Sequence, residues 1–415
     1  MANYDAVIVG AGVSGLIAAK ELESYKLKTL VIDAAPQVGG RLKSDQLDGY
    51  LMDHGFQVLL SAYPMVKKHL DLKALKTKAF SPGAFLFNGK ESILVQDVNR
   101  NSLALIPMIF SAVGSISDKL KMAKLRKQVM AQSPAEIYDE KDQSTMAFLK
   151  DYGFSKRIIE RFFQPFFGGI FLEFELETSS RQFLFIFKMF AEGDALLPEK
   201  GIEAVAQQLK SQLEKTEFRL NTKVKEIKQG KVIFEDGDEI EAQQIIVATD
   251  PQELIPQLED SLDWNQTLQL YFEGSKGPFS KKLISLSYAK NALINNVACL
   301  SAVQSAYAKS GKQLYSISLR RDPGLSENEL EAAVLKELYP LLGLKSKGWK
   351  LLRSFKVKKA LPRIDQVVYE RPFEESRLME GIYLAGDFLL NPSLNGAMLS
   401  GELAAKALIL NHQKS

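Results

Sequence analysis

The sequence predicts an α/β fold in which a Rossmann-like domain carries an inserted α+β domain. Three observations support this prediction. A short apolar strand near the start runs into a glycine-rich turn, the next apolar strand ends on a carboxylate, and a late apolar strand stops at Gly386-Asp387 before another helix. Because the strands of a Rossmann-like domain lie in one sheet, these distant segments are expected to meet at one site.

The first segment has the spacing of a dinucleotide-binding turn. Residues 7–9 are apolar and β-branched, and the pattern Gly-x-Gly-x-x-Gly follows them directly. In this motif the first glycine permits a tight turn, the second lets the backbone approach a pyrophosphate, and the third lets the helix pack against the strand. The phosphates are expected at the N-terminus of the helix that follows. The predicted binding residues are Gly10, Gly12, Val13, Ser14 and Gly15.

A second strand supports the same interpretation. Residues 29–32 are apolar, and the strand ends on Asp33. A carboxylate about 20 residues after the glycine turn accepts a hydrogen bond from a ribose hydroxyl in dinucleotide-binding domains. The strand before the turn, the helix after it and this acid make the site more specific than the glycine pattern alone.

The segment after the second strand resembles a known superfamily. A Gly-Gly-Arg sequence comes first, and an Asp-x-Gly segment follows at residues 53–55. This order is similar to that of FAD-dependent amine oxidases, phytoene desaturases and protoporphyrinogen oxidases, and the chain is closest in character to the desaturase-like members. The resemblance implies that the paired glycines approach the pyrophosphate, that the arginine donates to phosphate, and that the Asp-x-Gly segment passes the flavin. The residues concerned are Gly39, Gly40, Arg41, Gly55 and Phe56.

The same resemblance gives the C-terminal segment the flavin end of the site. Residues 381–385 are apolar, Gly386-Asp387 ends this strand, and a helical pattern begins near Gly396. By the resemblance, Asp387 faces the ribityl chain, and the helix N-terminus at Gly396 and Ala397 faces the flavin pyrimidine. This placement is electrostatically favourable because a reduced flavin carries negative charge there and a helix N-terminus stabilises it.

A middle segment supplies the rest of the predicted cofactor domain. Residues 196–213 open a helical pattern, two strand candidates flank a turn at residues 236–237, and residues 245–247 form a buried strand. By the resemblance, the backbone at the first strand of this segment holds the adenine, and the end of the last strand lies beside the dinucleotide. The predicted binding residues here are Val224, Ala248 and Thr249.

At 415 residues the chain exceeds the usual size of one hydrophobic core, so two domains are expected. Since the cofactor motifs occur at the beginning, middle and end, neither domain is continuous. The first insertion is largely helical by pattern, and the second contains strand candidates at residues 267–272, 283–287 and 313–319. The FAD-binding domain is assigned to residues 1–70, 195–252 and 375–415, and the substrate domain to residues 71–194 and 253–374.

Charge and cysteine usage exclude several classes of site. A net charge of +3 with 25% charged residues is close to balance, so no nucleic-acid partner is expected. The single cysteine, Cys299, excludes an internal disulfide. It lies in an apolar strand candidate far from the C-terminal flavin helix, so non-covalent FAD is expected. The histidines His54, His69 and His412 lack metal-ligand spacing, so no metal site is predicted.

Aromatic residues indicate the kind of substrate. Ten of the 24 phenylalanines lie between Phe162 and Phe190. Some belong in a helical core, and others are expected to line a pocket for a large apolar molecule. Amine oxidases of the resembled superfamily commonly place an aromatic residue shortly before the Gly-Ala of the last helix. Here those positions hold Ser393 and Leu394, which counts against an amine substrate.

These observations predict an FAD-dependent oxidoreductase that dehydrogenates or desaturates a hydrophobic small molecule, such as an isoprenoid, a carotenoid-like compound or another lipid. In hydride transfer to flavin N5 the protein chiefly positions the substrate and excludes water. His54 is interpreted as structural, so no catalytic acid or base is predicted. The electron acceptor stays open between oxygen and a quinone. The alternatives are a porphyrinogen oxidase, a redox-neutral flavin-dependent isomerase and a non-enzymatic FAD-binding protein.

The expected location is the cytoplasm. The N-terminal apolar stretch carries Asp5 and the glycine turn, so it predicts a strand and not a signal peptide. Peripheral contact with a membrane is a further hypothesis. Residues 103–116 are apolar, and Ser117-Asp118 are predicted to cap a basic amphipathic helix that ends at Met130. The alternative is an ordinary surface helix that packs its apolar side on the substrate domain.

Overall fold

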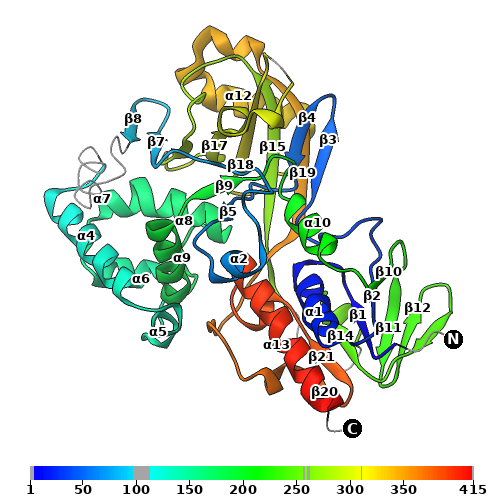
Figure 1. Cartoon of the computed structure of the whole chain (residues 1–415). Helices are drawn as coiled ribbons and strands as arrows, with labels where there is room; N and C mark the ends of the chain where they lie inside the picture. The colour runs from blue at the N-terminus through cyan, green and yellow to red at the C-terminus, as the bar shows by residue number, and fades with distance from the viewer. Residues whose placement is uncertain (1–3, 97–112, 256–257, 259–261, 310, 414–415) are drawn as a thin grey trace.

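The computed structural model describes residues 4–96, 113–255, 258, 262–309 and 311–413. In Figure 1, one part of the molecule contains a six-stranded sheet with helices α1 and α13, and the other contains a seven-stranded sheet and a group of helices. This arrangement confirms the predicted α/β class with a Rossmann-like domain.

The six-stranded sheet has the strand order β10-β2-β1-β14-β21-β20 and is parallel except at β20. Apolar, largely β-branched residues fill its central strands, and they are buried because both faces of the sheet are covered. The strands are β1 (Ala6–Val9), β2 (Thr29–Ile32), β10 (Glu217–Arg219), β14 (Ile245–Val247), β20 (Arg377–Met379) and β21 (Ile382–Leu384).

Helices α1 (Val13–Ser24) and α13 (Leu394–His412) pack together on one face of this sheet. Their backbones approach closely, because a Cβ on Gly401 would lie 2.2 Å from the carbonyl oxygen of Ser14. A small antiparallel sheet covers the other face with apolar side chains. It consists of β11 (Val224–Lys228), β12 (Lys231–Phe234) and β13 (Glu239–Glu241).

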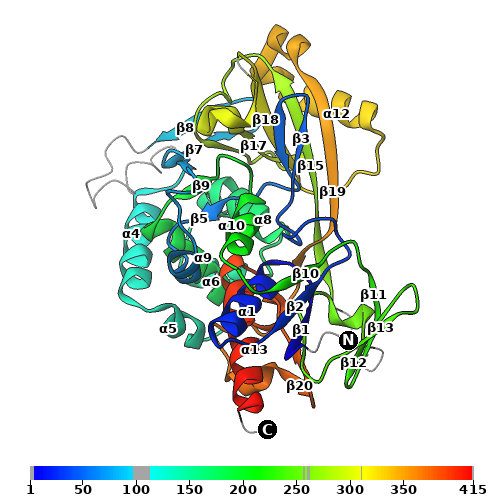
Figure 2. The same ribbon diagram turned by 45° about the vertical axis from the view of Figure 1, so that its right-hand side comes forward.

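The seven-stranded sheet has the order β19-β15-β18-β17-β16-β7-β8, and helix α12 (Glu327–Leu342) covers one of its faces. Three of its strands match the candidates of the second insertion. Strands β15 and β19 are long, and Figure 2 shows them running side by side toward the six-stranded sheet. The strands are β7 (Gly83–Phe87), β8 (Ser92–Gln96), β15 (Trp264–Gly274), β16 (Ile284–Ser287), β17 (Ile294–Cys299), β18 (Gln313–Leu319) and β19 (Lys350–Pro362).

Within the described part of the first insertion, the stretch from residue 116 to residue 192 is largely helical, as its pattern predicts, and a π-helical turn at residues 159–163 joins α7 to α8. Strands β7 and β8 were not predicted. They form because β7 pairs in parallel with β16 of the second insertion. The helices are α4 (Ile116–Ala131), α5 (Pro134–Asp139), α6 (Thr145–Asp151), α7 (Lys156–Ile158), α8 (Gln164–Phe171) and α9 (Ser180–Glu192).

Short elements connect the two parts. Residues 196–213 were predicted to open a helical pattern, but the helix begins only at Ala204. Leu196 and Leu197 belong to strand β9, since they pair with β5 and β6 on either side. No helix in the described part of the chain is long and apolar enough to cross a bilayer. The connecting elements are β3 (Ser44–Leu47), β4 (Tyr50–Asp53), β5 (Leu59–Leu60), α2 (Pro64–His69), β6 (Lys78–Ala79), β9 (Ala195–Leu197), α10 (Ala204–Ser211) and α11 (Leu300–Val303).

Helix α4 begins earlier than predicted. Ser115 is its N-cap, whereas the sequence pattern placed the cap at Ser117-Asp118. Asp118 is instead the third helical residue: its N–H donates to Ser115 Oγ at 3.1 Å, and its Oδ2 accepts from the Ser115 N–H at 2.7 Å. This reciprocal capping box satisfies two backbone donors and fixes the start. Most of the apolar stretch 103–116 lies outside the described residues.

Candidate functional site

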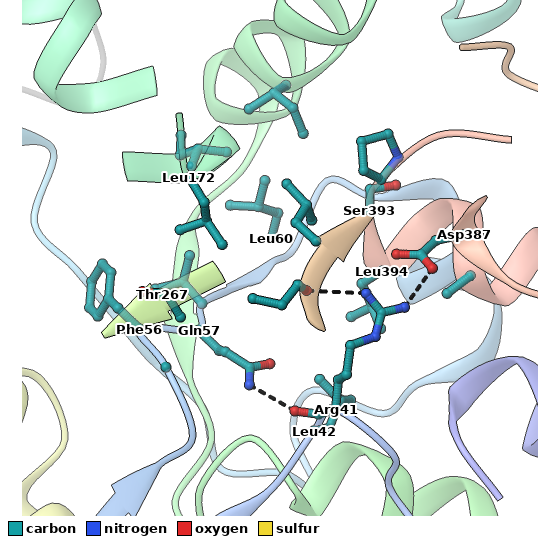
Figure 3. Close-up of a pocket in the computed structure, with 18 of the residues that line it drawn as sticks. Arg41, Leu42, Phe56, Gln57, Leu60, Leu172, Thr267, Asp387, Ser393 and Leu394 are labelled. Carbon is teal, nitrogen blue, oxygen red and sulfur yellow. Dashed lines mark hydrogen bonds and ion pairs between the residues drawn. The ribbon is translucent and has the colours of Figure 1, made fainter. Parts of the chain in front are cut away.

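A cavity of about 830 Å³ lies where the central parallel strands end. Gly10 follows β1, Asp33 follows β2, Ala248 follows β14 and Gly386 lies just after β21, and all four line the cavity. In open α/β sheets this edge is where ligands bind. From there the cavity extends to the seven-stranded sheet and to α8 and α9, and Figure 3 shows part of its lining.

The glycine turn brings helix α1 against the end of β1. Gly10 has a φ of 110°, which other residues rarely adopt, and a Cβ on Gly15 would lie 2.0 Å from the Gly10 carbonyl oxygen. Any side chain at Gly15 would therefore push the helix away from the strand. The roles of these two glycines are conformational, as the motif predicts.

Gly12 and Gly40 form a backbone cradle beside the N-terminus of α1. A Cβ on Gly40 would lie 3.0 Å from the Gly12 Cα, and both residues line the cavity. The first N–H groups of α1 have no partners within the helix, and its dipole favours an anion at this end. This arrangement fits the pyrophosphate of a dinucleotide.

Asp33 has a fixed orientation at the cavity wall. Its Oδ2 accepts a hydrogen bond from the Ala11 N–H at 2.7 Å, and its Oδ1 accepts one from the Ala35 N–H at 2.8 Å. An ionised carboxylate has about four acceptor sites, so two backbone bonds leave room for a ribose hydroxyl. The carboxylate therefore fits the role that its position in the sequence predicts.

Arg41 and Asp387 form an ion pair inside the cavity, as Figure 3 shows. Arg41 Nη2 lies 2.5 Å from Asp387 Oδ1, and Arg41 Nη1 donates to the Ala360 carbonyl at 3.2 Å. The guanidinium also lies 5.3 Å from the ring centroid of Trp264. The family resemblance implies separate contacts for these two residues, to phosphate and to the ribityl chain, whereas in the structure they pair with each other.

The first residues of α13 form another wall of the cavity. Ser393 is its N-cap, and Ser393 Oγ accepts from the Gly396 N–H at 2.9 Å. The Gly386 N–H donates to Ser400 Oγ at 2.8 Å, so the strand end and the helix are held together. Ala397 lines the cavity.

Comparison with known proteins identifies the group to which this fold and site belong. A model of the flavin-containing amine oxidoreductases matches residues 13–409. The chain belongs to this family. The predicted resemblance is therefore confirmed, and family membership implies a flavin cofactor and oxidoreductase activity.

Individual relatives of the family are distant. A 15-cis-phytoene desaturase of Solanum lycopersicum is 23% identical over 98% of this chain and 78% of its own length. Protoporphyrinogen oxidase 2 of Arabidopsis thaliana is 28% identical, but the match covers 39% of this chain and 31% of that protein. The solved structure of an oxidoreductase from Methanosarcina mazei is 17% identical and has a TM-score of 0.70 over 98% of this chain and 99% of its own. That similarity shows the shared fold.

Most residues predicted for the flavin site line the cavity. Three do not. Gly15 and Gly396 pack against backbone, and Val224 begins β11 in the core beside the sheet. The cofactor contacts of every predicted residue stay predictions. The predicted residues that line the cavity are Gly10, Gly12, Val13, Ser14, Asp33, Gly39, Gly40, Arg41, Gly55, Phe56, Ala248, Thr249, Gly386, Asp387 and Ala397.

The phenylalanine-rich segment has both of its predicted roles. Five of its ten rings line the cavity, four others are fully buried in the core, and the Phe174 ring lies 4.1 Å from the Arg320 guanidinium. Edge-to-face contacts connect the two groups, for example Phe167 with Phe183 at 4.7 Å between ring centroids. The rings in the lining are Phe162, Phe166, Phe167, Phe187 and Phe190, and the fully buried ones are Phe163, Phe171, Phe183 and Phe185.

The lining offers little acid–base chemistry. His54 lines the cavity, its Nε2 lies 3.0 Å from Asp45 Oδ1, and its ring lies tilted against Phe355 at 4.3 Å between ring centroids. Its structural role stays a prediction. Burial raises the pKa of Tyr63, so this hydroxyl stays protonated at neutral pH.

Several residues that line the cavity belong to no sequence motif. Trp264, Thr267, Asn296 and Ser318 reach the cavity from the seven-stranded sheet. They lie in β-strands whose alternating pattern shows which residues share a face, but not which face meets a ligand. Sequence reasoning could not select them because their place depends on how the two parts of the chain pack.

Proposed function

We propose that the protein binds FAD non-covalently and oxidises a hydrophobic small molecule, by dehydrogenation or desaturation, at this cavity. The observation that carries the proposal is the composition of the lining: a dinucleotide-shaped polar end joined to a wall of phenylalanines. Bound flavin supplies the hydride acceptor, N5 of its ring. In this proposal the electron acceptor is oxygen or a quinone.

The protein's own residues have three tasks in this reaction. Phe166, Phe187 and Phe190 bind the apolar substrate and keep water away from it. Arg41 and Asp387 fix the polar end of the site. No side chain is assigned to proton transfer.

An amine substrate fits this cavity less well. Ser393 and Leu394 line the cavity just before Gly396-Ala397, at the positions where amine oxidases of the resembled superfamily commonly place an aromatic residue. Non-covalent binding is favoured because the only cysteine, Cys299, is buried in the apolar core under α12 and does not line the cavity.

Anaerobic titration of the purified protein tests the proposal. We expect yellow protein whose visible absorbance bleaches on addition of an isoprenoid or polyene substrate, and does not bleach with putrescine, because the cavity binds apolar molecules. Bleaching by amines alone would contradict the proposal. Product formed under anaerobic conditions without bleaching and without any acceptor would instead select the isomerase.

The same sample tests the cofactor. Acid precipitation should release the flavin into the supernatant, and mass spectrometry should identify it as FAD. Flavin that stays with the pellet would contradict non-covalent binding, and FMN in the supernatant would contradict the dinucleotide site.

We further propose that α4 contacts an anionic membrane and so gives a water-insoluble substrate a path to the cavity. Ile116 is 76% exposed and Leu120 is 67% exposed on the outer side of this helix, with Lys124 and Lys127 exposed beside them. The predicted apolar face of the helix, with Met122, Leu125 and Val129, is buried in the protein, as the alternative of an ordinary surface helix predicts, and Met122 lines the cavity. The membrane contact proposed here therefore rests on the outer side. Such a helix combines apolar contact with attraction to anionic lipids.

Sedimentation with vesicles tests this contact. We expect the protein to pellet with phosphatidylglycerol vesicles at low salt, and Leu120→Glu plus Lys124→Glu to reduce the pelleted fraction several-fold, since both attractions are lost. Lys336→Glu, an exposed lysine on α12, is the matched control. Equal recovery in the supernatant with and without vesicles would rule out the membrane proposal.

A further inference from the structure

The seven-stranded sheet presents a row of uncharged polar side chains to the cavity. Thr267 on β15, Ser318 on β18 and Asn296 on β17 all line it. Ser318 pairs with Gln269 of β15 on one side and with Asn296 of β17 on the other, so the row crosses neighbouring strands. Polar side chains on an otherwise apolar wall require hydrogen-bond partners.

Ser318 and Asn296 have partners on the same sheet. Ser318 Oγ lies 2.7 Å from Gln269 Oε1 and 3.2 Å from Asn296 Oδ1, and Gln269 Nε2 donates to Ser316 Oγ at 2.7 Å. The oxygen of the Asn296 amide therefore faces Ser318, and the amide nitrogen lies on the other side of that side chain. Among the described residues, none accepts a hydrogen bond from Asn296 Nδ2, although Asn296 is only 2% exposed.

A ligand that fills the cavity displaces water from Asn296 Nδ2, and a donor that is then left without an acceptor is unfavourable. Asn296 lines the cavity, so an acceptor placed in the cavity can satisfy its Nδ2. The acceptor must come from the molecule bound there. The neighbouring Asn295 also has an amide without partners in the described part of the chain, but its two polar atoms are fully enclosed and it does not line the cavity.

The surroundings favour an uncharged acceptor. Within the described residues 71–194 and 262–374, the charged side chains of the lining are Asp194 and Lys359, each near a predicted domain boundary. Lys359 Nζ pairs with Asp250 at 2.7 Å and with Glu253. Arg41 and Lys43 also line the cavity, and Arg41 is paired with Asp387. Two of the three lysine and arginine side chains that line the cavity within the described ranges are thus already balanced by carboxylates of the protein, which disfavours a carboxylate or a phosphate on the ligand.

The row also lies on the flavin side of the cavity. Thr267 Cγ2 is 3.6 Å from the position of a Cβ on Gly55, and Tyr271 Oη donates to the Asp53 carbonyl at 2.7 Å. Strand β15 thus runs along the Asp-x-Gly segment, with Gln269 between these two contacts. Met122 and the phenylalanine wall extend the cavity toward α4.

From this geometry we infer that the substrate is amphipathic, with one neutral hydroxyl or carbonyl oxygen that accepts a hydrogen bond from Asn296 Nδ2. Its apolar remainder lies along the phenylalanine wall toward α4. The inference rests on the proposed function, because it specifies the substrate of that same cavity. It makes Asn296 a specificity residue and excludes a pure hydrocarbon as the preferred ligand.

Equilibrium dialysis of the flavin-loaded protein tests the inference with three tritiated probes of one skeleton: geranylgeraniol, the hydrocarbon with a methyl group in place of its hydroxymethyl group, and the corresponding carboxylate. We expect the alcohol to bind roughly ten-fold more tightly than the hydrocarbon, which is typical of one hydrogen bond. The carboxylate should bind more weakly than the alcohol, because Arg41 and Lys359 are already paired with carboxylates of the protein.

Two variants assign the preference to one side chain. Asn296→Leu, of similar size, should weaken binding of the alcohol to the level of the hydrocarbon and leave hydrocarbon binding unchanged. Asn295→Leu is the matched control, since Asn295 is the adjacent residue, is equally buried and does not line the cavity. It should keep the preference for the alcohol.

The possible failures are distinguishable. Equal binding of alcohol and hydrocarbon by the unmodified protein would contradict the hydrogen bond to Asn296. It would still agree with the proposal that the cavity binds apolar molecules. Loss of both probes in Asn296→Leu would show a structural role instead of recognition, and loss of the preference in Asn295→Leu would remove its assignment to Asn296. If the unmodified protein bound none of the three probes, both the proposed function and this inference would be wrong.

Discussion

Replacement of Gly12 by valine is expected to weaken flavin binding by about a hundred-fold, or about 3 kcal/mol, and to leave the fold of the flavin-free protein intact. Gly12 has φ −72° and ψ 178°, a conformation open to any residue, and a Cβ there would be no closer than 3.8 Å to its nearest neighbour, Gly40 Cα. The added methyl groups would instead occupy the cradle where the pyrophosphate is expected.

The flavin-to-protein absorbance ratio and the dissociation constant of the reconstituted protein measure this effect, and urea unfolding without flavin measures the fold. Gly348→Val is a control at an exposed position, where the nearest atoms to a Cβ lie 4.0 Å away. Gly15→Val should behave oppositely and destabilise the flavin-free protein, because its Cβ would overlap the Gly10 carbonyl oxygen. Normal flavin affinity in Gly12→Val would show that the backbone cradle of Gly12 and Gly40 does not bind the pyrophosphate.

The second large effect concerns a buried carboxylate between α2 and α13. Glu402 Oε1 accepts hydrogen bonds from His69 Nε2 at 2.6 Å and from Lys68 Nζ, and the Glu402 side chain is only 3% exposed. Burial alone would raise the pKa of this carboxyl. The hydrogen bonds and charges of His69 and Lys68 outweigh burial and lower the pKa from its ordinary value of 4.5 to about 2.

Glu402→Gln is therefore expected to lower the free energy of unfolding at neutral pH by about 3 kcal/mol. Since the folded pKa lies below the unfolded one, the ionised carboxylate stabilises the fold fully above pH 4.5. This contribution is lost as the pH falls through 4.5 toward 2. The difference between the unmodified protein and the variant should shrink over that range, and urea unfolding at several pH values measures it.

Glu160→Gln provides the matched comparison on the surface. Glu160 pairs with Lys156 at 3.7 Å in an exposed pair, so its replacement should cost at most about 0.5 kcal/mol. If the effect of Glu402→Gln were the same at pH 7 and pH 3, protonation of Glu402 would not contribute to acid unfolding. The explanation through its lowered pKa would then be wrong.

The parts of the fold that could be predicted are those set by local sequence. A glycine turn between a buried strand and a helix fixes its own backbone, so the place of Gly12 and Asp33 at the cavity followed from spacing alone. The same holds for Gly386 at the end of a late apolar strand. Each of these positions depends on neighbours a few residues away.

The parts that could not be predicted depend on pairing between distant segments. Strand β7 exists because β16 lies beside it, and the ion pair of Arg41 with Asp387 exists because the last helix returns to the first turn. From the sequence, Asn296 is an ordinary residue of a buried strand. Its open amide nitrogen is visible only when the cavity and the hydrogen bonds of Ser318 are known.

The order of strands in the six-stranded sheet has a consequence for how the protein is made. On the ribosome β14 emerges long before β21, which later pairs with it from the far end of the chain. Until then β14 has an unpaired edge, and α1 lacks the cover of α13. Such an edge favours aggregation and recognition by chaperones. Under the proposal that Asp387 contacts the flavin, a stably held cofactor marks a polypeptide whose synthesis has passed this strand, because Asp387 is translated after β21.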